Sequence, residues 1–196
     1  MRVERLREEF PLGVEWCPYE LRPGLPAEGI PMARVLGRGR YTPEYFDYLR
    51  QMAEEAGIRL AERTLLPRSR PSLEAAEFAR GAGAFEPFHR SLFSAYFEHD
   101  RNIGDPAVLR ELAEGCGLDG AALADSLSNG RYAPLVDEKV SWARGLGLGG
   151  IPTFIFDGRF VMIGGQEYGV FRSLAQRVLS LRTEAPPPRA YGPGSA

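Results

Sequence analysis

The sequence predicts an α/β protein whose small β-sheet is interrupted by a large all-helical insertion. Three observations support this prediction. A β-rich segment lies at residues 14–21, helical periodicity extends from residue 42 to residue 147, and a β-hairpin pattern follows at residues 151–163. Because strand patterns lie on both sides of the helical stretch, the helices are expected to form a unit of their own between two parts of one sheet.

The first predicted elements are a helix and a strand. Val3, Leu6 and Phe10 have helical spacing with charged residues between them, and no capping residue precedes them, so the chain is expected to start inside a helix. Residues 14–21 alternate between apolar and polar side chains in their first half, which is typical of a strand. A loop rich in Pro and Gly follows up to Pro31.

Six helices are predicted between residues 42 and 147, where apolar side chains recur with helical periodicity. Polar N-cap residues or prolines in the first turn mark most of their starts. The residues predicted to cap or open these helices are, in chain order, Thr42, Ser72, Glu86, Asp105, Asp119 and Tyr132.

The last part of the chain predicts a β-hairpin and a final helix. Asp157-Gly158 separates two apolar runs, and Asp-Gly is the strongest short hairpin signal. Phe171, Leu174 and Val178 then recur with helical spacing. The resulting division is a sheet-containing portion at residues 1–35 and 148–182, a helical insertion at residues 42–147, and a disordered tail rich in Pro and Gly at residues 183–196.

The composition excludes several classes of function. With 24 Lys+Arg against 26 Asp+Glu in 196 residues, the chain lacks the excess of positive charge that favours binding to nucleic acids. No apolar run is long enough to span a membrane, and the first residues lack the apolar core of a signal peptide, which predicts a cytoplasmic protein. The sequence contains two cysteines, Cys17 and Cys116, and two histidines, His89 and His99. These few residues predict neither a disulfide framework nor a metal site.

The segment GIPTF at residues 150–154 is the candidate functional motif. A proline that enters an interior strand cannot donate a backbone hydrogen bond, and a cis bond with a turn would leave the backbone of the preceding residue unpaired. An extended peptide can bind such groups, so Ile151, Pro152 and Thr153 are the predicted substrate-binding residues. The alternative is an edge-strand proline without a functional role.

Seven segments of the sequence together resemble those of a known family. They are VEWCPYELRP at residues 14–23, PAEG at 26–29, SLEAAEFAR at 72–80, FHRSLFSAYF at 88–97, DRNIGD at 100–105, GIPTF at 150–154 and GGQ at 164–166. The chain resembles the DsbA-like oxidoreductases of the thioredoxin superfamily, and in particular their FrnE-type branch, over roughly residues 3–181.

The resemblance implies a thioredoxin-like fold and thiol–disulfide exchange with protein or small-molecule thiols and disulfides, without a cofactor. In that family a mixed disulfide forms beside the proline that corresponds to Pro152, and a C-x-x-C pair at the start of the first helix supplies the thiols. This sequence starts inside that helix and contains no C-x-x-C. It is therefore expected to be an N-terminally truncated form that lacks the first strand and the catalytic dithiol and is inactive by itself.

Neither cysteine is expected to replace the missing dithiol. Cys17 lies in the predicted strand, where the family tends to have arginine, and no helix N-terminus is predicted beside it to stabilise a thiolate. Cys116 falls in the apolar stripe of a predicted helix and is expected in the core. His89 and His99 are expected at helix surfaces rather than as catalytic bases.

Two alternatives remain open for the function. One is the related group of kappa-type glutathione transferases and 2-hydroxychromene-2-carboxylate isomerases, which share the insertion and the G-[IV]-P motif but use a serine with glutathione as cofactor. The other is a redox-inactive peptide-binding module. The residue at the start of the first helix would distinguish the three possibilities.

Overall fold

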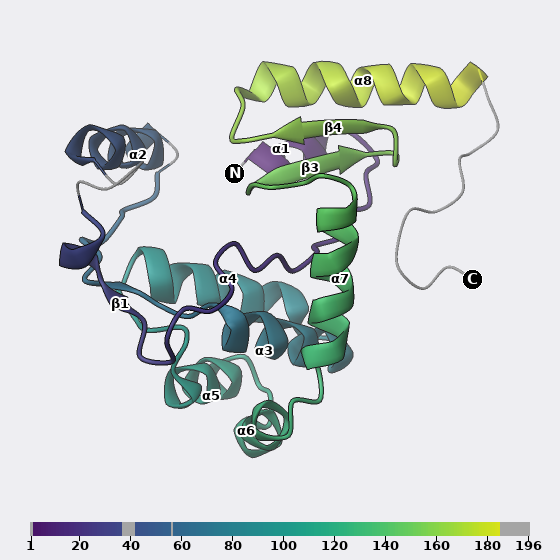
Figure 1. The fold of residues 1–196 in the computed structure, drawn as a ribbon. Coiled ribbons are helices and arrows are strands. Elements are labelled where there is room, and N and C mark those ends of the chain that lie inside the picture. Colours follow the sequence, from purple (N-terminus) through teal and green to yellow (C-terminus); the bar gives the residue numbers. More distant parts are fainter. Residues whose placement is uncertain (1, 37–41, 56, 185–196) are drawn as a thin grey trace. The chain divides into compact units, whose positions relative to one another are not determined.

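The computed structural model describes residues 2–36, 42–55 and 57–184 (Figure 1). These residues belong to two compact units, one formed by Met1–Leu21 with Glu138–Ala196 and the other by Arg22–Asp137. The domain boundaries expected from the sequence stay a prediction. Within the described residues, no helix is both long enough and apolar enough to cross a membrane.

The first unit is a two-stranded hairpin packed against helices. It contains α1 (Arg2–Glu9), β3 (Thr153–Phe156), β4 (Phe160–Ile163) and α8 (Tyr168–Glu184). The strands are antiparallel, with Thr153 opposite Ile163 and Phe156 opposite Phe160. One face of the hairpin packs on α1 and α8 around four buried side chains, and Phe154 and Phe156 border this core. The buried residues are Leu6, Met162, Phe171 and Ala175.

The predicted Asp-Gly hairpin turn is confirmed. Asp157 and Gly158 have left-handed φ angles of 54° and 63°, and the Arg159 N–H donates to the Phe156 carbonyl at 3.0 Å across them. Because the strands pair at Phe156 and Phe160, the hairpin loop consists of residues 157–159. The Asp157 side chain is almost fully buried and accepts hydrogen bonds from Arg182 near the end of α8. This contact raises the pKa of Arg182 and fastens the turn to the helix.

The second unit is mainly helical, as the sequence predicts. Its core is formed by small and large apolar side chains from four helices. The fully buried side chains of this core include Ala75, Ala79, Phe88, Leu109, Ala113 and Leu123. The elements are β1 (Ile30–Pro31), η1 (Met32–Arg34), α2 (Pro43–Glu55), β2 (Leu65–Leu66), α3 (Arg70–Gly81), α4 (Phe85–Phe97), α5 (Pro106–Gly115), α6 (Gly120–Ser128) and α7 (Ala133–Gly145).

Three of the predicted helix caps are confirmed and one is wrong. Thr42 accepts a hydrogen bond from the backbone N–H of Tyr45 at 3.3 Å. Asp105 accepts a hydrogen bond from the backbone N–H of Ala107 at 2.8 Å, and Asp119 accepts two from the first turn of α6. Ser72, by contrast, lies inside α3 and donates its hydroxyl to the carbonyl of Ser69. The helix starts earlier because Pro71 is well suited to a first turn, where its missing N–H has no helical partner to lose.

Two further expectations are corrected. Residues 14–21 do not form a strand, because no described segment pairs with their backbone, and an extended segment becomes a strand only through such pairing. The last helix continues to Glu184, two residues into the predicted tail, and residues 185–196 lie outside the described residues.

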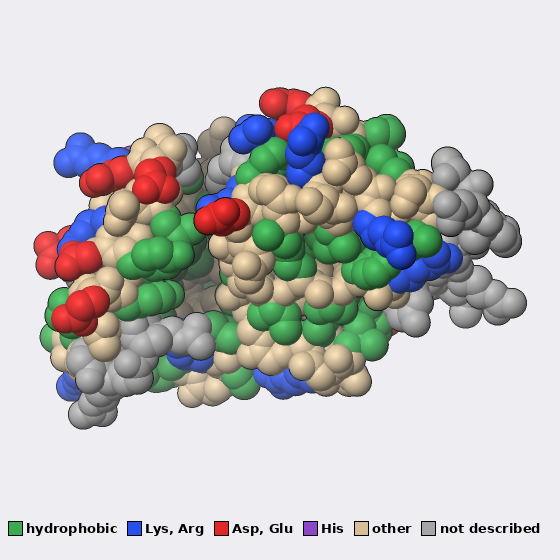
Figure 2. Space-filling model, turned by 90° about the horizontal axis from the view of Figure 1, so that it is seen from above, with side chains coloured by type: hydrophobic (Ala, Val, Ile, Leu, Met, Phe, Trp, Pro, Cys, Tyr) green, Lys and Arg blue, Asp and Glu red, His purple; other side chains and the backbone are tan. Residues whose placement is uncertain are grey.

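The surface seen from the side of α8 carries hydrophobic, polar and charged side chains (Figure 2). Figure 2 shows hydrophobic side chains that reach the surface among polar ones, with acidic and basic side chains at several separate places. Several aliphatic side chains of the first unit are about half exposed, and they include Leu146, Ile151, Val161, Ile163 and Val170. Two of these positions, Ile151 and Val161, lie at opposite edges of the β3–β4 hairpin.

Candidate functional site

The GIPTF motif forms an exposed loop that leads into β3. Ile151 is 51% exposed, Pro152 is also exposed, and Thr153 is half-buried as the first residue of the strand. The peptide bond between Ile151 and Pro152 is cis. The three predicted substrate-binding residues therefore lie together at the surface of the first unit.

The backbone hydrogen bonds show which groups of this loop are free. The Gly164 N–H donates to the Pro152 carbonyl at 2.8 Å, which places that pair in register with the rest of the hairpin. Because hydrogen-bonded pairs alternate along an antiparallel ladder, the backbone groups of Thr153 and Ile155 point away from β4. Ile151 makes no backbone hydrogen bond with any other described residue. This open edge of β3 can pair with an extended peptide.

A side-chain hydrogen bond stabilises the loop from within. The Thr153 hydroxyl donates to the Gly150 carbonyl at 2.7 Å and so closes the turn around the proline. At the other end of the hairpin, the Gln166 side-chain amide donates to the Ile163 carbonyl at 3.1 Å. Gln166 is the glutamine of the GGQ segment, so two polar residues of the motifs singled out in the sequence hold the backbone at this end of the sheet.

The segment that contains Cys17 is anchored beside the chain that leads to the loop. The Tyr19 hydroxyl donates to the Leu148 carbonyl at 2.9 Å, and Arg144 approaches the Glu20 carbonyl at 3.4 Å. Cys17 itself is exposed and is not in a disulfide. Tyr19 and Arg144 carry no signal in the sequence, since contacts between residues 129 and 124 positions apart leave no local pattern.

The remaining candidates lie in the other unit. Cys116 is half-buried and its thiol is 3.7 Å from the Ser91 hydroxyl, and neither cysteine forms a disulfide, as expected. The His89 ring lies between the rings of Phe85 and Phe93 at centroid distances of 5.0 and 4.7 Å. These residues are not part of the loop around Pro152.

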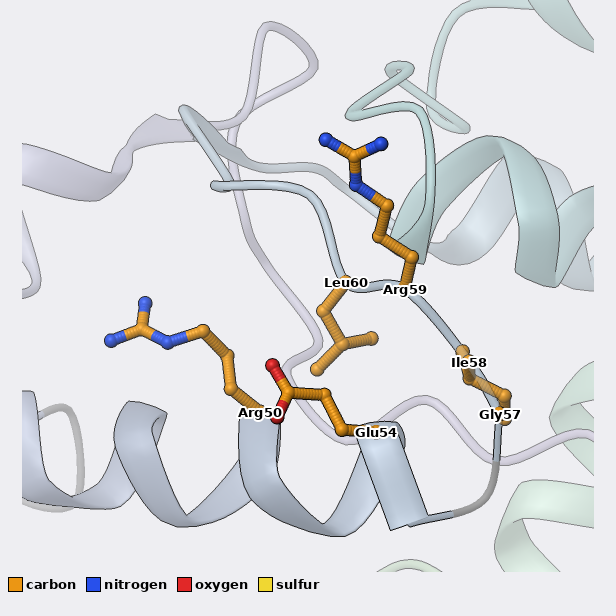
Figure 3. Close-up of a pocket in the computed structure, with 6 residues that line it drawn as sticks. All are labelled: Arg50, Glu54, Gly57, Ile58, Arg59 and Leu60. Atoms are coloured by element: carbon orange, nitrogen blue, oxygen red, sulfur yellow. The ribbon is translucent and has the colours of Figure 1, made fainter.

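The described residues contain no group of three or more His, Cys, Asp or Glu side chains that could hold a metal ion. They do contain a shallow pocket in the helical unit (Figure 3). Figure 3 shows the guanidinium groups of Arg50 and Arg59 at separate places, so the charged groups do not converge on one ligand position. The residues that line the pocket are Arg50, Glu54, Gly57, Ile58, Arg59 and Leu60.

The hairpin, its proline loop and the helices that cover it define a thioredoxin-like protein. The family model of the DSBA-like thioredoxin domain matches residues 1–176. The chain therefore belongs to the DSBA-like thioredoxin domain family, and its fold is the thioredoxin-like DsbA fold, rich in helix and with two small antiparallel sheets in the described part.

Three individual proteins are similar to this chain, with sequence identities between 20% and 30%. The uncharacterized protein YwbO of Bacillus subtilis is 30% identical over 149 residues, which are 72% of this chain and 70% of that protein. A probable DsbA oxidoreductase from Streptomyces coelicolor has a similar structure, with a TM-score of 0.85 and 24% identity over 98% of this chain and 89% of its own. A 2-hydroxychromene-2-carboxylate isomerase has a TM-score of 0.66 and 20% identity over 93% of this chain and 89% of its own.

Proposed function

We propose that the protein takes part in thiol–disulfide exchange, and that Ile151, Pro152 and Thr153 bind the extended backbone around a substrate's thiol or disulfide. The observation that carries this proposal is the free backbone of Ile151 beside the open edge of β3. Membership of the DSBA-like family supports the same reaction class. The substrates would be protein or small-molecule thiols and disulfides in the cytoplasm.

The reaction requires thiols that this sequence does not place together. A thiolate attacks a disulfide, a mixed disulfide forms, and a second nearby thiol displaces the substrate. Cys17 and Cys116 do not form a C-x-x-C pair and belong to different units. We therefore expect the 196-residue chain to bind substrates without turning them over.

Substrate binding is tested with a short labelled peptide that carries one cysteine. Ile151→Arg places a long charged side chain at an exposed position beside the free backbone, so we expect the peptide affinity to fall at least about tenfold, or about 1.4 kcal/mol. Val170→Arg is the matched control, because Val170 is 46% exposed in the same unit and lies on α8. Fluorescence anisotropy measures both. Equal affinity for Ile151→Arg and the unmodified chain would show that the loop is not the binding site.

The predicted lack of catalytic activity is tested with an insulin reduction assay. The chain is expected to be inactive, and an N-terminal extension that supplies a strand and a C-x-x-C helix start is expected to produce activity, because a helix N-terminus lowers the pKa of the attacking thiol. Activity of the unextended chain that disappears on Cys17→Ser would instead identify Cys17 as the reactive thiol. An extended chain that binds peptide but stays inactive would favour the peptide-binding module.

A glutathione-dependent function is the second candidate. The structural similarity to a 2-hydroxychromene-2-carboxylate isomerase extends over 93% of this chain, and that similarity supports a shared fold. Titration calorimetry with glutathione separates the two candidates. Saturable glutathione binding that Ile151→Arg abolishes, without peptide binding, would favour the isomerase or transferase.

A further inference from the structure

The outer edge of β4 is a second unpaired strand edge, on the opposite side of the hairpin from the loop at Ile151. Since the pair formed by Pro152 and Gly164 is hydrogen-bonded, Val161 and Ile163 direct their backbone groups away from β3. No other described strand joins this sheet. The edge therefore presents backbone donors and acceptors to solvent.

Within β4, this edge lacks the charged residues and the proline that often prevent two strands from pairing. Natural edge strands carry charged residues, proline or bulges, or are covered by other elements. The sequence of β4 is Phe-Val-Met-Ile, without charge or proline. The side chains of Val161 and Ile163 are 52% and 54% exposed on the face that α8 does not cover, whereas Met162 is buried. A partner strand would cover aliphatic surface as well as pair the backbone.

Val161 is the centre of the free part of this edge. The carbonyl of Ile163 already accepts a hydrogen bond from the Gln166 side chain, so its pairing capacity is partly used. Val161 has both its N–H and its carbonyl free of other described residues. In an antiparallel pair, such a residue exchanges both hydrogen bonds with one residue directly opposite.

We propose that this edge binds a second copy of the chain, with the two β4 strands antiparallel about a two-fold axis at Val161. The edge is self-complementary about this axis, which favours a second copy as its partner. Under this axis Val161 exchanges both backbone hydrogen bonds with Val161 of the partner subunit. Ile163 then lies opposite Arg159 of the partner subunit, so no like charges meet across the edge. The product is a four-stranded sheet in which each β3 edge stays open for substrate.

Sedimentation velocity over a range of protein concentrations tests this dimer. Val161→Lys adds a charge at the two-fold axis, where two copies of it would face each other, and we expect the dimer dissociation constant to rise at least about tenfold. Val170→Lys is the matched control, since it makes the same change at a similarly exposed position outside the strand. Circular dichroism and a cooperative unfolding transition check that each variant is folded, and Ile163→Lys replaces Val161→Lys if the latter is not.

Cross-linking tests the position of the axis. With Cys17 and Cys116 replaced by serine, Val161→Cys is expected to form a disulfide-linked dimer rapidly when diamide is added as the oxidant. Directly opposed residues of a hydrogen-bonded pair have Cα atoms about 5.5 Å apart, which is within disulfide range. Val170→Cys is expected to cross-link slowly. The proposal is overturned by a monomer at every concentration, by a dimer that Val161→Lys does not weaken, by growth beyond a dimer, or by equal cross-linking of the two variants.

Discussion

The Arg70 side chain donates hydrogen bonds to three different groups in the helical unit. It donates to Glu74 and Asp137, each at 2.6 Å, and to the Ala133 carbonyl at 2.8 Å. Its side chain and that of Glu74 are only 13% and 10% exposed. These contacts raise the pKa of Arg70, with the hydrogen bond to Asp137 as the main cause. One side chain thus links the start of α3 to the start of α7.

We predict that Arg70→Met strongly destabilises the helical unit. The substitution keeps much of the apolar stem but leaves the buried Glu74 carboxylate and the Ala133 carbonyl without their donor, and breaking a buried ion pair in this way costs about 3–5 kcal/mol. Urea denaturation measures the change. Arg110→Met is the matched control, because the ion pair of Arg110 with Glu114 is exposed, and it is expected to change the urea midpoint little. Similar losses in both variants would contradict the prediction.

At the scale of single elements, helix starts are fixed by side chains that accept backbone hydrogen bonds. Asp119 bonds the N–H groups of Ala121 and Ala122 at 2.9 and 3.0 Å, and Asp105 does the same for α5 with Ala107. Without such an acceptor the first N–H groups of a helix have no protein partner. These two helices form part of the core of the helical unit, so their first turns support its packing.

We predict that Asp119→Ala and Asp105→Ala each lower the free energy of unfolding by about 0.5–2 kcal/mol. Asp119→Asn should lose much less, because the amide oxygen can still accept the same hydrogen bonds. Thermal and urea unfolding followed by circular dichroism measure these differences. If Asn is as destabilising as Ala at position 119, then charge at the helix N-terminus matters more there than the capping hydrogen bond.

At the scale of the whole molecule, the chain forms two units, each with its own hydrophobic cluster. In the first unit the hairpin packs on α1 and α8, and Arg172 of α8 forms an ion pair with Glu9 at 2.9 Å. In the second unit, arginine–carboxylate pairs join separate segments, as in Arg101 with Glu111. Many of these pairs are exposed, so their contribution depends on pH and on salt.

We predict that the helical unit loses stability in acid. The hydrogen bond from Arg70 lowers the pKa of Asp137, and the hydrogen bond from Arg101 lowers the pKa of Glu111. A carboxyl whose folded pKa is depressed contributes stability above its unfolded pKa, about 3.9 for Asp and 4.3 for Glu, and loses that contribution as pH falls toward the folded value. Urea midpoints should therefore be nearly constant above about pH 5 and fall below about pH 4.

The matched variant for this pH dependence carries Asp137→Asn and Glu111→Gln together. It should be less stable at neutral pH and should show a shallower loss in acid, because the two titrating groups are gone. Parallel pH profiles for the variant and the unmodified chain would assign the acid sensitivity to other carboxyl groups.

The sequence by itself determined the local features of this protein. The Asp157-Gly158 turn, the caps at Asp105 and Asp119, and the helical stretch that separates two parts of the chain are all present in the structure. The motifs that resemble DsbA-like proteins also identified the family correctly. Each of these signals depends on residues a few positions apart, and the amino-acid types in such a short segment determine its conformational preference.

Only the tertiary structure decided which extended segments pair and which edges stay open. Residues 14–21 have the pattern of a strand and are not one, whereas Ile30 and Pro31 pair with Leu65 and Leu66 in a small sheet that no pattern predicted. The anchoring of Tyr19 and the contacts of Arg70 also join residues far apart in the chain. A strand exists through hydrogen bonds to a second segment, so its presence depends on a partner whose distance in sequence no local periodicity encodes.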